Sequence, residues 1–549
     1  MRQTLYFNGD ILTMDDLSPN AQAVLTEDGI IRHVGTMDEV LRLADETAVK
    51  IDLQHRTLMP AFLDPHSHVT ALASTMRLTN LQGTQDFEEI AARLAKALWE
   101  HPAAPGEWLM GFGYDHNSLK EQRHPTRELL DEVSQEVPIL ITHASGHMGV
   151  VNSAGLRLWG ITAQTPDPEG GVIGRQADSQ PSGYLEENAF MEYSRKVAPP
   201  SFGQIANGFM RAQQSYLEHG ITTIQDGKLG AADFELLQKL ARQGLLKADV
   251  VGYIDLKGSG ELLRQHEELE EYQDQFRLGG YKLFLDGSPQ GKTAWLTQPY
   301  QGSEDGYCGY PVYTDEQVQG FFRQVLEQRQ QMLVHCNGDA ACEQMLRCME
   351  TLRLQTGCDW KPLRPVMIHA QLLRKDQMQR VKELGIIPSF FVAHTYHWGD
   401  VHLQNLGDRA RSISPAGSAM RHGIPFTFHQ DTPVIEPDMM ETIWCAVQRT
   451  TRQGIQLSEE ERIPVSEALK AVTVYAAYQY FEEDSKGSIS PGKLADLIVL
   501  SENPLRVPAE RLREIQVLRT IKDGECVYER DISAPGAQSD GTNGLAQKA

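Results

Sequence analysis

This chain of 549 residues lacks paired-cysteine motifs and long apolar runs. It has seven cysteines, an odd number, and no two of them form a Cys-x-x-Cys motif. We therefore expect reduced thiols, and neither a disulfide framework nor a zinc ribbon. No apolar run approaches the roughly 18 residues of a membrane span, and the first ten residues lack the apolar centre of a signal peptide. These absences predict a cytoplasmic protein with no membrane partner.

Positive charge is also scarce relative to negative charge. Lysine and arginine together number 51 and aspartate and glutamate 74, which gives a formal net charge of −23 at pH 7. Such a surface repels phosphate backbones, so nucleic acid is a poor candidate partner and a small-molecule substrate is a better one. Hydrophobic residues make up 41% of the chain, which is enough for a large globular core. The sequence leaves open whether the protein forms a homo-oligomer.

Both ends of the chain have the short strands and tight turns of a β domain. The dipeptides Asn8-Gly9, Asp28-Gly29 and Asp523-Gly524 lie beside apolar runs and are typical of two-residue hairpins. We therefore predict that residues 1–57 and 485–530 together form one small β-sandwich domain.

The middle of the chain, residues 58–484, repeats a different unit. Helices are predicted near 204–219 and 374–384, and each ends at a glycine that is followed at once by an apolar strand. A third helix is predicted to begin at 314–317, which has the form of a capping box. Such βα repeats predict a (β/α)₈ TIM barrel.

Two further segments fall outside this repeat. We assign residues of about 85–200, including a candidate strand at 139–142, to an insertion that we expect to cover the barrel rim. The polar segment 531–549 is predicted to be a disordered tail.

The clearest local sign of chemistry is a pair of histidines, His66 and His68, just after the apolar run 58–63. Side chains two residues apart point the same way where a strand ends, and neutral imidazole is a good ligand for Zn²⁺. Surface loops carry this His-x-His pattern by chance, so alone it is weak support for a metal site.

Three more potential ligands follow apolar strand runs. His335 closes the run 332–334, His369 closes 365–368, and Asp431 comes just after 426–430. Each histidine alone is better explained by a hydrogen bond in the core or a loop. In a barrel, however, the carboxyl ends of all strands open onto one rim, so these residues are expected to converge.

A lysine, Lys282, lies inside the apolar run 281–285. Burying its charge is costly, and burial depresses its pKa. The neutral amine could react with CO₂ to form a carbamate that bridges two metal ions. A salt bridge with Asp286 or another carboxylate explains the lysine equally well.

The sequence around these residues is distinctive over six stretches: Met59–His68, Tyr281–Ser288, His335–Ala340, Ile368–Gln371, Asp431–Val434 and Gly487–Leu497. Together they resemble the amidohydrolase superfamily, and in particular its subgroup of N-substituted formamide deformylases. The resemblance covers nearly the whole chain.

The resemblance implies one or two divalent metal ions, with Zn²⁺ as the expected cofactor. His66 and His68 would hold one ion, His335 and His369 the other, and carboxylated Lys282 would bridge them.

The resemblance also implies hydrolysis of a C–N bond, in an amide or an N-substituted formamide, by metal-activated water. Asp431, beside the first ion, would be the catalytic proton shuttle and a further metal ligand.

Two positions depart from the family pattern, at 288–292 and at 429–430, and both lie where substrate is expected. Residues proposed to contact substrate are His147, His394, His397, His429 and Lys292.

Two other functions remain open. The same barrel could act on a lactone, a cyclic imide or a phosphoester, because fold alone does not select the bond. A non-catalytic binding protein of the same fold is less favoured, because all six expected ligands are present.

Overall fold

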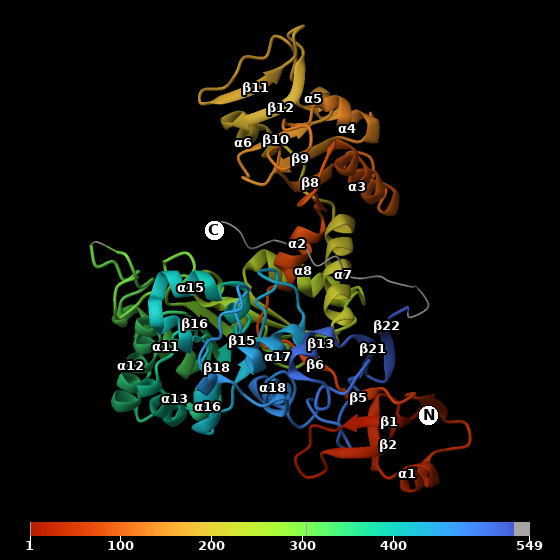
Figure 1. Cartoon of the computed structure of the whole chain (residues 1–549), viewed down its shortest axis with the longest axis vertical. Coiled ribbons are helices and arrows are strands. Elements are labelled where there is room, and N and C mark those ends of the chain that lie inside the picture. The colour runs from red at the N-terminus through yellow and green to blue at the C-terminus, as the bar shows by residue number, and fades with distance from the viewer. Residues whose placement is uncertain (1, 304, 532–549) are drawn as a thin grey trace. The chain divides into compact units, whose positions relative to one another are not determined.

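The computed structural model describes residues 2–303 and 305–531. The chain forms two compact units (Figure 1). The first comprises the segments up to Thr70 and from Gln213 onward, and the second comprises Ala71–Ala212. The boundaries fall inside helices α2 (Val69–Met76) and α7 (Phe202–Glu218). All but the first residue of the predicted disordered tail, 531–549, lies outside the described residues.

A parallel sheet of eight strands forms the centre of the first unit. Each strand pairs with the strands before and after it in the order β6, β13, β14, β15, β16, β17, β18 and β19. Their bounds are β6 (Phe62–Leu63), β13 (Ile221–Leu229), β14 (Asp249–Asp255), β15 (Phe276–Phe284), β16 (Met332–Cys336), β17 (Val366–His369), β18 (Ile387–Phe390) and β19 (Thr427–Phe428).

Helices connect these strands and follow the last of them, and one further helix, α1, precedes the first of them, β6, in the chain. The helices of the first unit are α1 (Met37–Leu43), α8 (Ala231–Arg242), α9 (Leu256–Ser259), α10 (Glu261–Gln265), α11 (Asp315–Gln328), α12 (Asp339–Thr356), α13 (Met378–Leu384), α14 (His394–His397), α15 (Gly399–Leu406), α16 (Ala416–Arg421), α17 (Met439–Gln448), α18 (Val465–Ala471) and α19 (Val474–Gln479). No helix among residues 2–303 and 305–531 has both the length and the apolarity needed to cross a bilayer.

The predicted capping box and the two predicted helix ends at glycines are confirmed, but the helix predicted to start near 374 begins at Met378, after a 3₁₀ turn at Lys375–Gln377. The Thr314 side chain accepts from the Gln317 amide while the Gln317 side chain accepts from the Thr314 amide, so the capping box begins α11. Gly220 and Gly385 adopt positive φ of 81° and 69° after α7 and α13, a conformation that costs glycine little. Each turn sends the chain directly into a buried strand, β13 or β18.

The parallel order agrees with the predicted barrel, but closure of the barrel stays a prediction. Within the described chain, no strand pairing joins β19 to β6. The segments after these two strands do meet, because the His68 amide donates to the Thr432 carbonyl at 2.8 Å.

A second sheet of the first unit combines strands from both ends of the chain. Its order is β22-β21-β20-β5-β1-β2-β3, with β4 beside β1. The red N-terminal and blue C-terminal strands can be followed in Figure 1. Their bounds are β1 (Gln3–Leu12), β2 (Asn20–Glu27), β3 (Ile30–Gly35), β4 (Val49–Asp52), β5 (Thr57–Pro60), β20 (Leu497–Leu500), β21 (Val517–Lys522) and β22 (Glu525–Glu529). The two-layer sandwich predicted for these segments remains a prediction.

Two of the three predicted hairpins are confirmed, and one is wrong. Asp28-Gly29 joins β2 to β3, and Asp523-Gly524 joins β21 to β22. Asn8-Gly9 lies instead inside β1, where the register with β2 shifts between Phe7 and Ile11. The neighbouring chain explains the difference, because the Phe7 and Asn8 carbonyls accept from amides of the segment 53–55. The strand therefore continues past an irregularity, in which Asn8 has a φ of 59°, and does not turn back.

The second unit has its own six-stranded sheet, in the order β11-β12-β10-β9-β8-β7. The predicted strand 139–142 is β9 of this sheet. The elements of the unit are β7 (Thr79–Asn80), α3 (Phe87–Glu100), β8 (Leu109–Tyr114), α4 (Arg127–Val133), β9 (Ile139–His143), β10 (Met148–Val151), α5 (Ser153–Trp159), β11 (Gly171–Arg175), β12 (Pro181–Glu187) and α6 (Asn188–Ser194).

Candidate metal centre and active site

Several potential metal ligands lie at or just beyond the carboxyl ends of the parallel strands. His66 follows β6, His335 is the fourth residue of β16, His369 ends β17, and Asp431 follows β19. Phe284 at the end of β15 pairs with His335, and Cys336 pairs with His369, so neighbouring strands end at similar levels. The strand order therefore brings together residues that are up to several hundred positions apart in the sequence.

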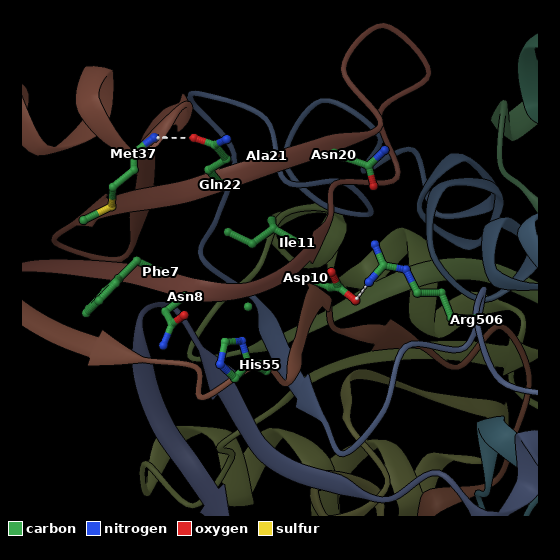
Figure 2. A pocket seen from close by; sticks show the side chains of 11 residues that line it. Phe7, Asn8, Asp10, Ile11, Asn20, Ala21, Gln22, Met37, His55 and Arg506 are labelled. Atoms are coloured by element: carbon green, nitrogen blue, oxygen red, sulfur yellow. Dashed lines mark hydrogen bonds and ion pairs between the residues drawn. The ribbon is translucent and has the colours of Figure 1, made fainter.

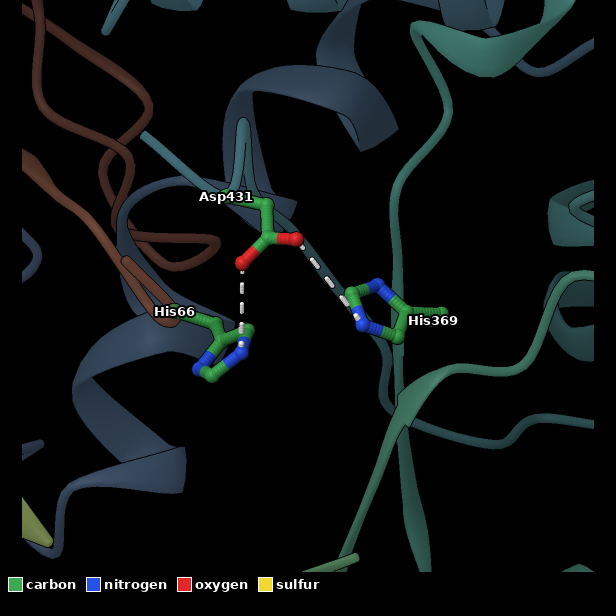
Figure 3. Close-up of side chains that lie close together, drawn as sticks. All are labelled: His66, His369 and Asp431. Atoms are coloured by element: carbon green, nitrogen blue, oxygen red, sulfur yellow. Dashed lines mark ion pairs between the residues drawn. The ribbon is translucent and has the colours of Figure 1, made fainter. Parts of the chain in front are cut away.

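Asp431 lies at the centre of this histidine cluster. Its Oδ1 atom is 3.5 Å from Nε2 of His66 and 3.3 Å from Nε2 of His68, and its Oδ2 atom is 4.0 Å from Nε2 of His369. Figure 3 shows the carboxylate between the His66 and His369 rings. Although Oδ1 is buried, it makes no hydrogen bond within the described residues. An unpaired buried carboxylate oxygen among imidazole nitrogens suits a divalent cation.

The other two predicted ligands join the same cluster. The amine of Lys282 lies 3.0 Å from Nε2 of His66. Nδ1 of His335 lies 3.1 Å from Nε2 of His369. The structure thus brings together all six residues that the sequence singled out as metal ligands.

The proton on His66 can be placed from its neighbours. Gln225 donates through its amide nitrogen to the carbonyl of Pro65, at 2.7 Å, so its amide oxygen must be the atom that faces His66. That oxygen is 2.6 Å from Nδ1 of His66 and can only accept. Nδ1 therefore carries the proton, and the lone pair on Nε2 points toward Asp431 and Lys282. This is the tautomer that a metal ligand needs.

Burial keeps the rings of His66, His335 and His369 neutral at neutral pH. It lowers the pKa of His66 and His369 well below the usual histidine value. Burial, together with the charge of Lys282, lowers the pKa of His335 to about 4. Neutral imidazole is the form that binds metal ions.

The pKa values of Lys282 and Asp431 are both lower than is usual for these residue types. Burial lowers the pKa of Lys282 to about 7, so its amine is partly neutral near neutral pH. Burial would raise the pKa of Asp431, but the neighbouring His68, His429 and Lys282 outweigh it and hold the carboxyl below its usual range.

The salt bridge that could have explained Lys282 is not formed. Asp286 instead accepts from the backbone amides of Asn337, Gly338 and Trp295, at 2.9, 2.7 and 3.0 Å. Among the described residues, Lys282 has no ion pair with any carboxylate. Its role is therefore tied to His66 and the cluster.

Another group in the second unit, Asp115, His116 and His143, also has ligand atoms close together. Its hydrogen bonds argue against a metal there. The backbone amide of Ser145 donates to Nδ1 of His143 at 3.0 Å, so neutral His143 carries its proton on Nε2. That nitrogen is the one that faces Asp115 and His116, at 3.5 and 3.2 Å. The lone pair needed for a cation is thus already used.

Comparison with known proteins decides the family. The model of the amidohydrolase family matches residues 50–528, which is most of the chain. This chain belongs to the amidohydrolase family. It is a hydrolase of the metal-dependent amidohydrolase type, and the family implies a small-molecule substrate.

Curated relatives and solved structures agree with this assignment. The amidohydrolase is 29% identical to the N-substituted formamide deformylase of Arthrobacter pascens, over 96% of this chain and 99% of the relative. It is 27% identical to the putative amidohydrolase YtcJ of Bacillus subtilis, over 96% of this chain and 100% of the relative. A structure of an uncharacterized metal-dependent hydrolase from Pyrococcus furiosus matches with a TM-score of 0.71 and 25% identity, over 92% of this chain and all of that one.

The residues proposed to contact substrate have varied surroundings in the amidohydrolase. His397 is held on both sides, because Arg452 donates to Nδ1 at 2.9 Å and Nε2 lies 2.7 Å from Glu441. His394 is buried and lies 3.0 Å from His402. Lys292 is exposed in the turn after β15.

The two remaining residues of this set differ in burial. His147 lies in the second unit and faces Glu187 at 3.2 Å. His429 is fully buried and joins the metal-ligand cluster beside His369.

Sequence reasoning missed Gln225, which sets the His66 tautomer. A usable signal existed, because Gln225 and Asp226 follow the apolar run 221–224 just as the recognised ligands follow theirs. Asp226 is also engaged there, and accepts from the amide and hydroxyl of Thr70 at 2.9 and 2.6 Å.

A cavity of about 810 Å³ lies elsewhere, over the terminal sheet of the amidohydrolase (Figure 2). Its lining shares no residue with the histidine cluster. Its charged groups are already paired, since Arg506 donates to Asp10 at 2.7 Å. We assign it no function.

Proposed function

We propose that this amidohydrolase hydrolyses a C–N bond, in an amide or an N-substituted formamide. The observation that carries the proposal is the position of Asp431, whose two oxygens face three imidazoles. The Arthrobacter relative, an N-substituted formamide deformylase by name, supports this choice of bond.

The cluster fits one or two divalent metal ions. In the proposal, His66 and His68 would hold one ion, while His335 and His369 would hold the other. Carboxylated Lys282 would bridge them. The fit rests on the lone pair of His66, which points into the cluster toward Asp431 and Lys282, and on the buried Oδ1 of Asp431 without a hydrogen bond. Imidazole nitrogen with carboxylate oxygen is a donor set typical of Zn²⁺, which we propose as the cofactor.

When bound, such an ion supplies Lewis-acid chemistry, which makes water a nucleophile at neutral pH and polarises a carbonyl. Asp431 would accept a proton from the attacking water as its oxygen bonds to the carbonyl carbon. The same carboxyl would then return the proton to the departing nitrogen as the C–N bond breaks. The products are a carboxylic acid and a neutral amine. The low pKa of Asp431 keeps it ionised and able to accept.

Substrate panels on zinc-loaded protein test the proposal. The panel contains N-formyl amines, acyl amides, cyclic imides, lactones and aryl phosphates. The background rate for each substrate is measured with Asp431→Asn protein of equal metal content. We expect kcat/KM to be highest on the formyl amines or acyl amides. Faster hydrolysis of a lactone, an imide or a phosphoester would assign the site to that bond instead, and no turnover by metal-loaded protein would support a binding role.

A further inference from the structure

His369 contacts a second buried histidine that is not among the six candidate ligands. Nδ1 of His369 lies 3.1 Å from Nε2 of His429, and Nδ1 of His429 lies 2.8 Å from the hydroxyl oxygen of Ser389. All three side chains are buried, and His429 and Ser389 are fully so. They come from the end of β17, the middle of β18 and the segment after β19. Side chains from three neighbouring strands and their ends therefore form one short series of hydrogen bonds, which ends at a candidate metal ligand, His369.

The same series continues on the other side of His369. Nε2 of His369 lies 3.1 Å from Nδ1 of His335, and Nε2 of His335 lies 3.2 Å from the carbonyl of Gly287. The amide nitrogen of Asn337 lies 3.1 Å from the same Nε2 and itself donates to the Gly287 carbonyl, at 2.8 Å. A carbonyl only accepts, so in the arrangement where Nε2–H of His335 also donates to it, the lone pair of His335 is on Nδ1, which faces His369.

Between these ends the hydrogen bonds can run in two directions. In one direction Ser389 donates to His429, His429 to His369 and His369 to His335, which places the His369 proton on Nε2. In the other direction Nδ1–H of His369 donates to His429, and Nδ1–H of His429 donates to Ser389. Only the second leaves the lone pair of Nε2 of His369 directed at Asp431, 4.0 Å away. The two arrangements hold equal numbers of protons.

The tautomer of His66 is fixed, because the amide oxygen of Gln225 can only accept a hydrogen bond from Nδ1–H. His369 has an imidazole as its partner, and an imidazole can donate or accept. The tautomer of His369 thus depends on what His429 does, and the tautomer of His429 depends on the Ser389 hydroxyl. A residue hydrogen-bonded to the outer nitrogen of a metal ligand typically changes metal affinity about 10–100-fold when it is mutated.

We propose that His429 and Ser389 are positioning residues that set the tautomer of His369 for metal binding. Nε2 of His429 accepts a hydrogen bond from Nδ1–H of His369, and Nδ1–H of His429 donates to the Ser389 hydroxyl oxygen, so that Nε2 of His369 keeps its lone pair. The inference rests on the proposed metal site. It assigns His429 the role of orienting His369, a candidate metal ligand. This role is distinct from the substrate contact expected for His429 from its place in the sequence.

The test measures the Zn²⁺ dissociation constant of the full chain by competition with a chromophoric chelator. In His429→Leu, which lacks an acceptor, we expect that constant to rise about 10–100-fold. In His429→Gln, the amide oxygen can accept from His369, and we expect binding within a few-fold of wild type. Ser389→Ala should fall between the two.

His402→Leu is the matched control, because His402 is also buried and paired with a histidine, His394, outside the candidate ligand set. It should lower the thermal midpoint of the metal-free protein about as much as His429→Leu and leave Zn²⁺ binding unchanged. Wild-type affinity in His429→Leu, or equal losses in His429→Gln and His429→Leu, would overturn the inference while the proposed function stands. Absence of Zn²⁺ binding by wild type would overturn both.

Discussion

The amine of Lys282 lies 3.0 Å from Nε2 of His66, the nitrogen that carries the lone pair because Nδ1 donates to Gln225. Lys282 is therefore the donor in this contact, although burial lowers its pKa to about 7. A buried amine that is partly neutral at physiological pH is available to react with CO₂. The resulting carbamate would place two oxygens beside His66, where the cluster now has a single amine.

Lys282→Met tests this role. Because the variant lacks a bridging group, we expect elemental analysis to find less bound metal per chain and kcat/KM to fall by at least about 10²-fold. Lys228→Met is the control, since both ammonium groups lie 4.9 Å from the Phe284 ring but only Lys228 is exposed. Full metal content with wild-type turnover in Lys282→Met would show that the lysine plays no part.

Asp431→Asn tests the proton shuttle. Asparagine keeps an oxygen among the imidazoles but cannot take up the proton from water, so kcat should fall about 10²–10⁴-fold at verified metal content. Asp400→Asn is a suitable comparison, because Asp400 accepts from Thr451 on another part of the first unit. Turnover of Asp431→Asn within a few-fold of wild type would rule out the shuttle.

The candidate ligands could be found from sequence because of a general property of parallel sheets. His335, His369 and Asp431 each follow an apolar run, and the carboxyl ends of such strands meet at one edge. This approach does not find residues that act indirectly, by forming a hydrogen bond to a candidate ligand. Gln225 is 159 positions from His66, and although it follows an apolar run, nothing in the sequence pairs it with that histidine.

Asn8-Gly9 shows a second reason for failure. Its local chemistry matches that of Asp28-Gly29, yet only the latter forms a hairpin. At Gly9 an added Cβ would lie 2.4 Å from the Arg56 carbonyl and 2.6 Å from Leu53, so this glycine permits a close approach between two chain segments. Tertiary packing decided the outcome, and a dipeptide carries no information about it.

Removing metal should destabilise the protein if the cluster binds it in the folded state. Zn²⁺ at 100 times its dissociation constant adds about 2.7 kcal/mol to the free energy of unfolding. We expect a chelator to lower the thermal midpoint, and added Zn²⁺ to restore it. His66→Ala should abolish this shift, whereas His116→Ala in the second unit should retain it. Loss of the shift in His116→Ala alone would place the ion in the second unit.

Acid stability should depend on Glu482, which lies in a buried ion network. Its Oε1 is 2.7 Å from Arg277 and its Oε2 is 2.6 Å from Lys486, which also pairs with Asp249 at 2.6 Å. Burial opposes ionisation, but Lys486 and Arg277 outweigh it and lower the pKa of Glu482 to about 2. The unfolded chain binds this proton near pH 4.5, so the network's contribution is complete above that pH and is lost as the pH falls toward 2.

Glu482→Gln should therefore lower the free energy of unfolding at pH 7 by about 3–5 kcal/mol, since it leaves two buried cations short of a partner. The variant should also lose less stability than wild type between pH 4.5 and 2, the range set by the shifted pKa. Urea denaturation across this range measures both effects. Glu460→Gln removes an exposed pair with Lys375 and should change neither. An acid profile of Glu482→Gln parallel to that of wild type would mean that another carboxylate sets the acid limit.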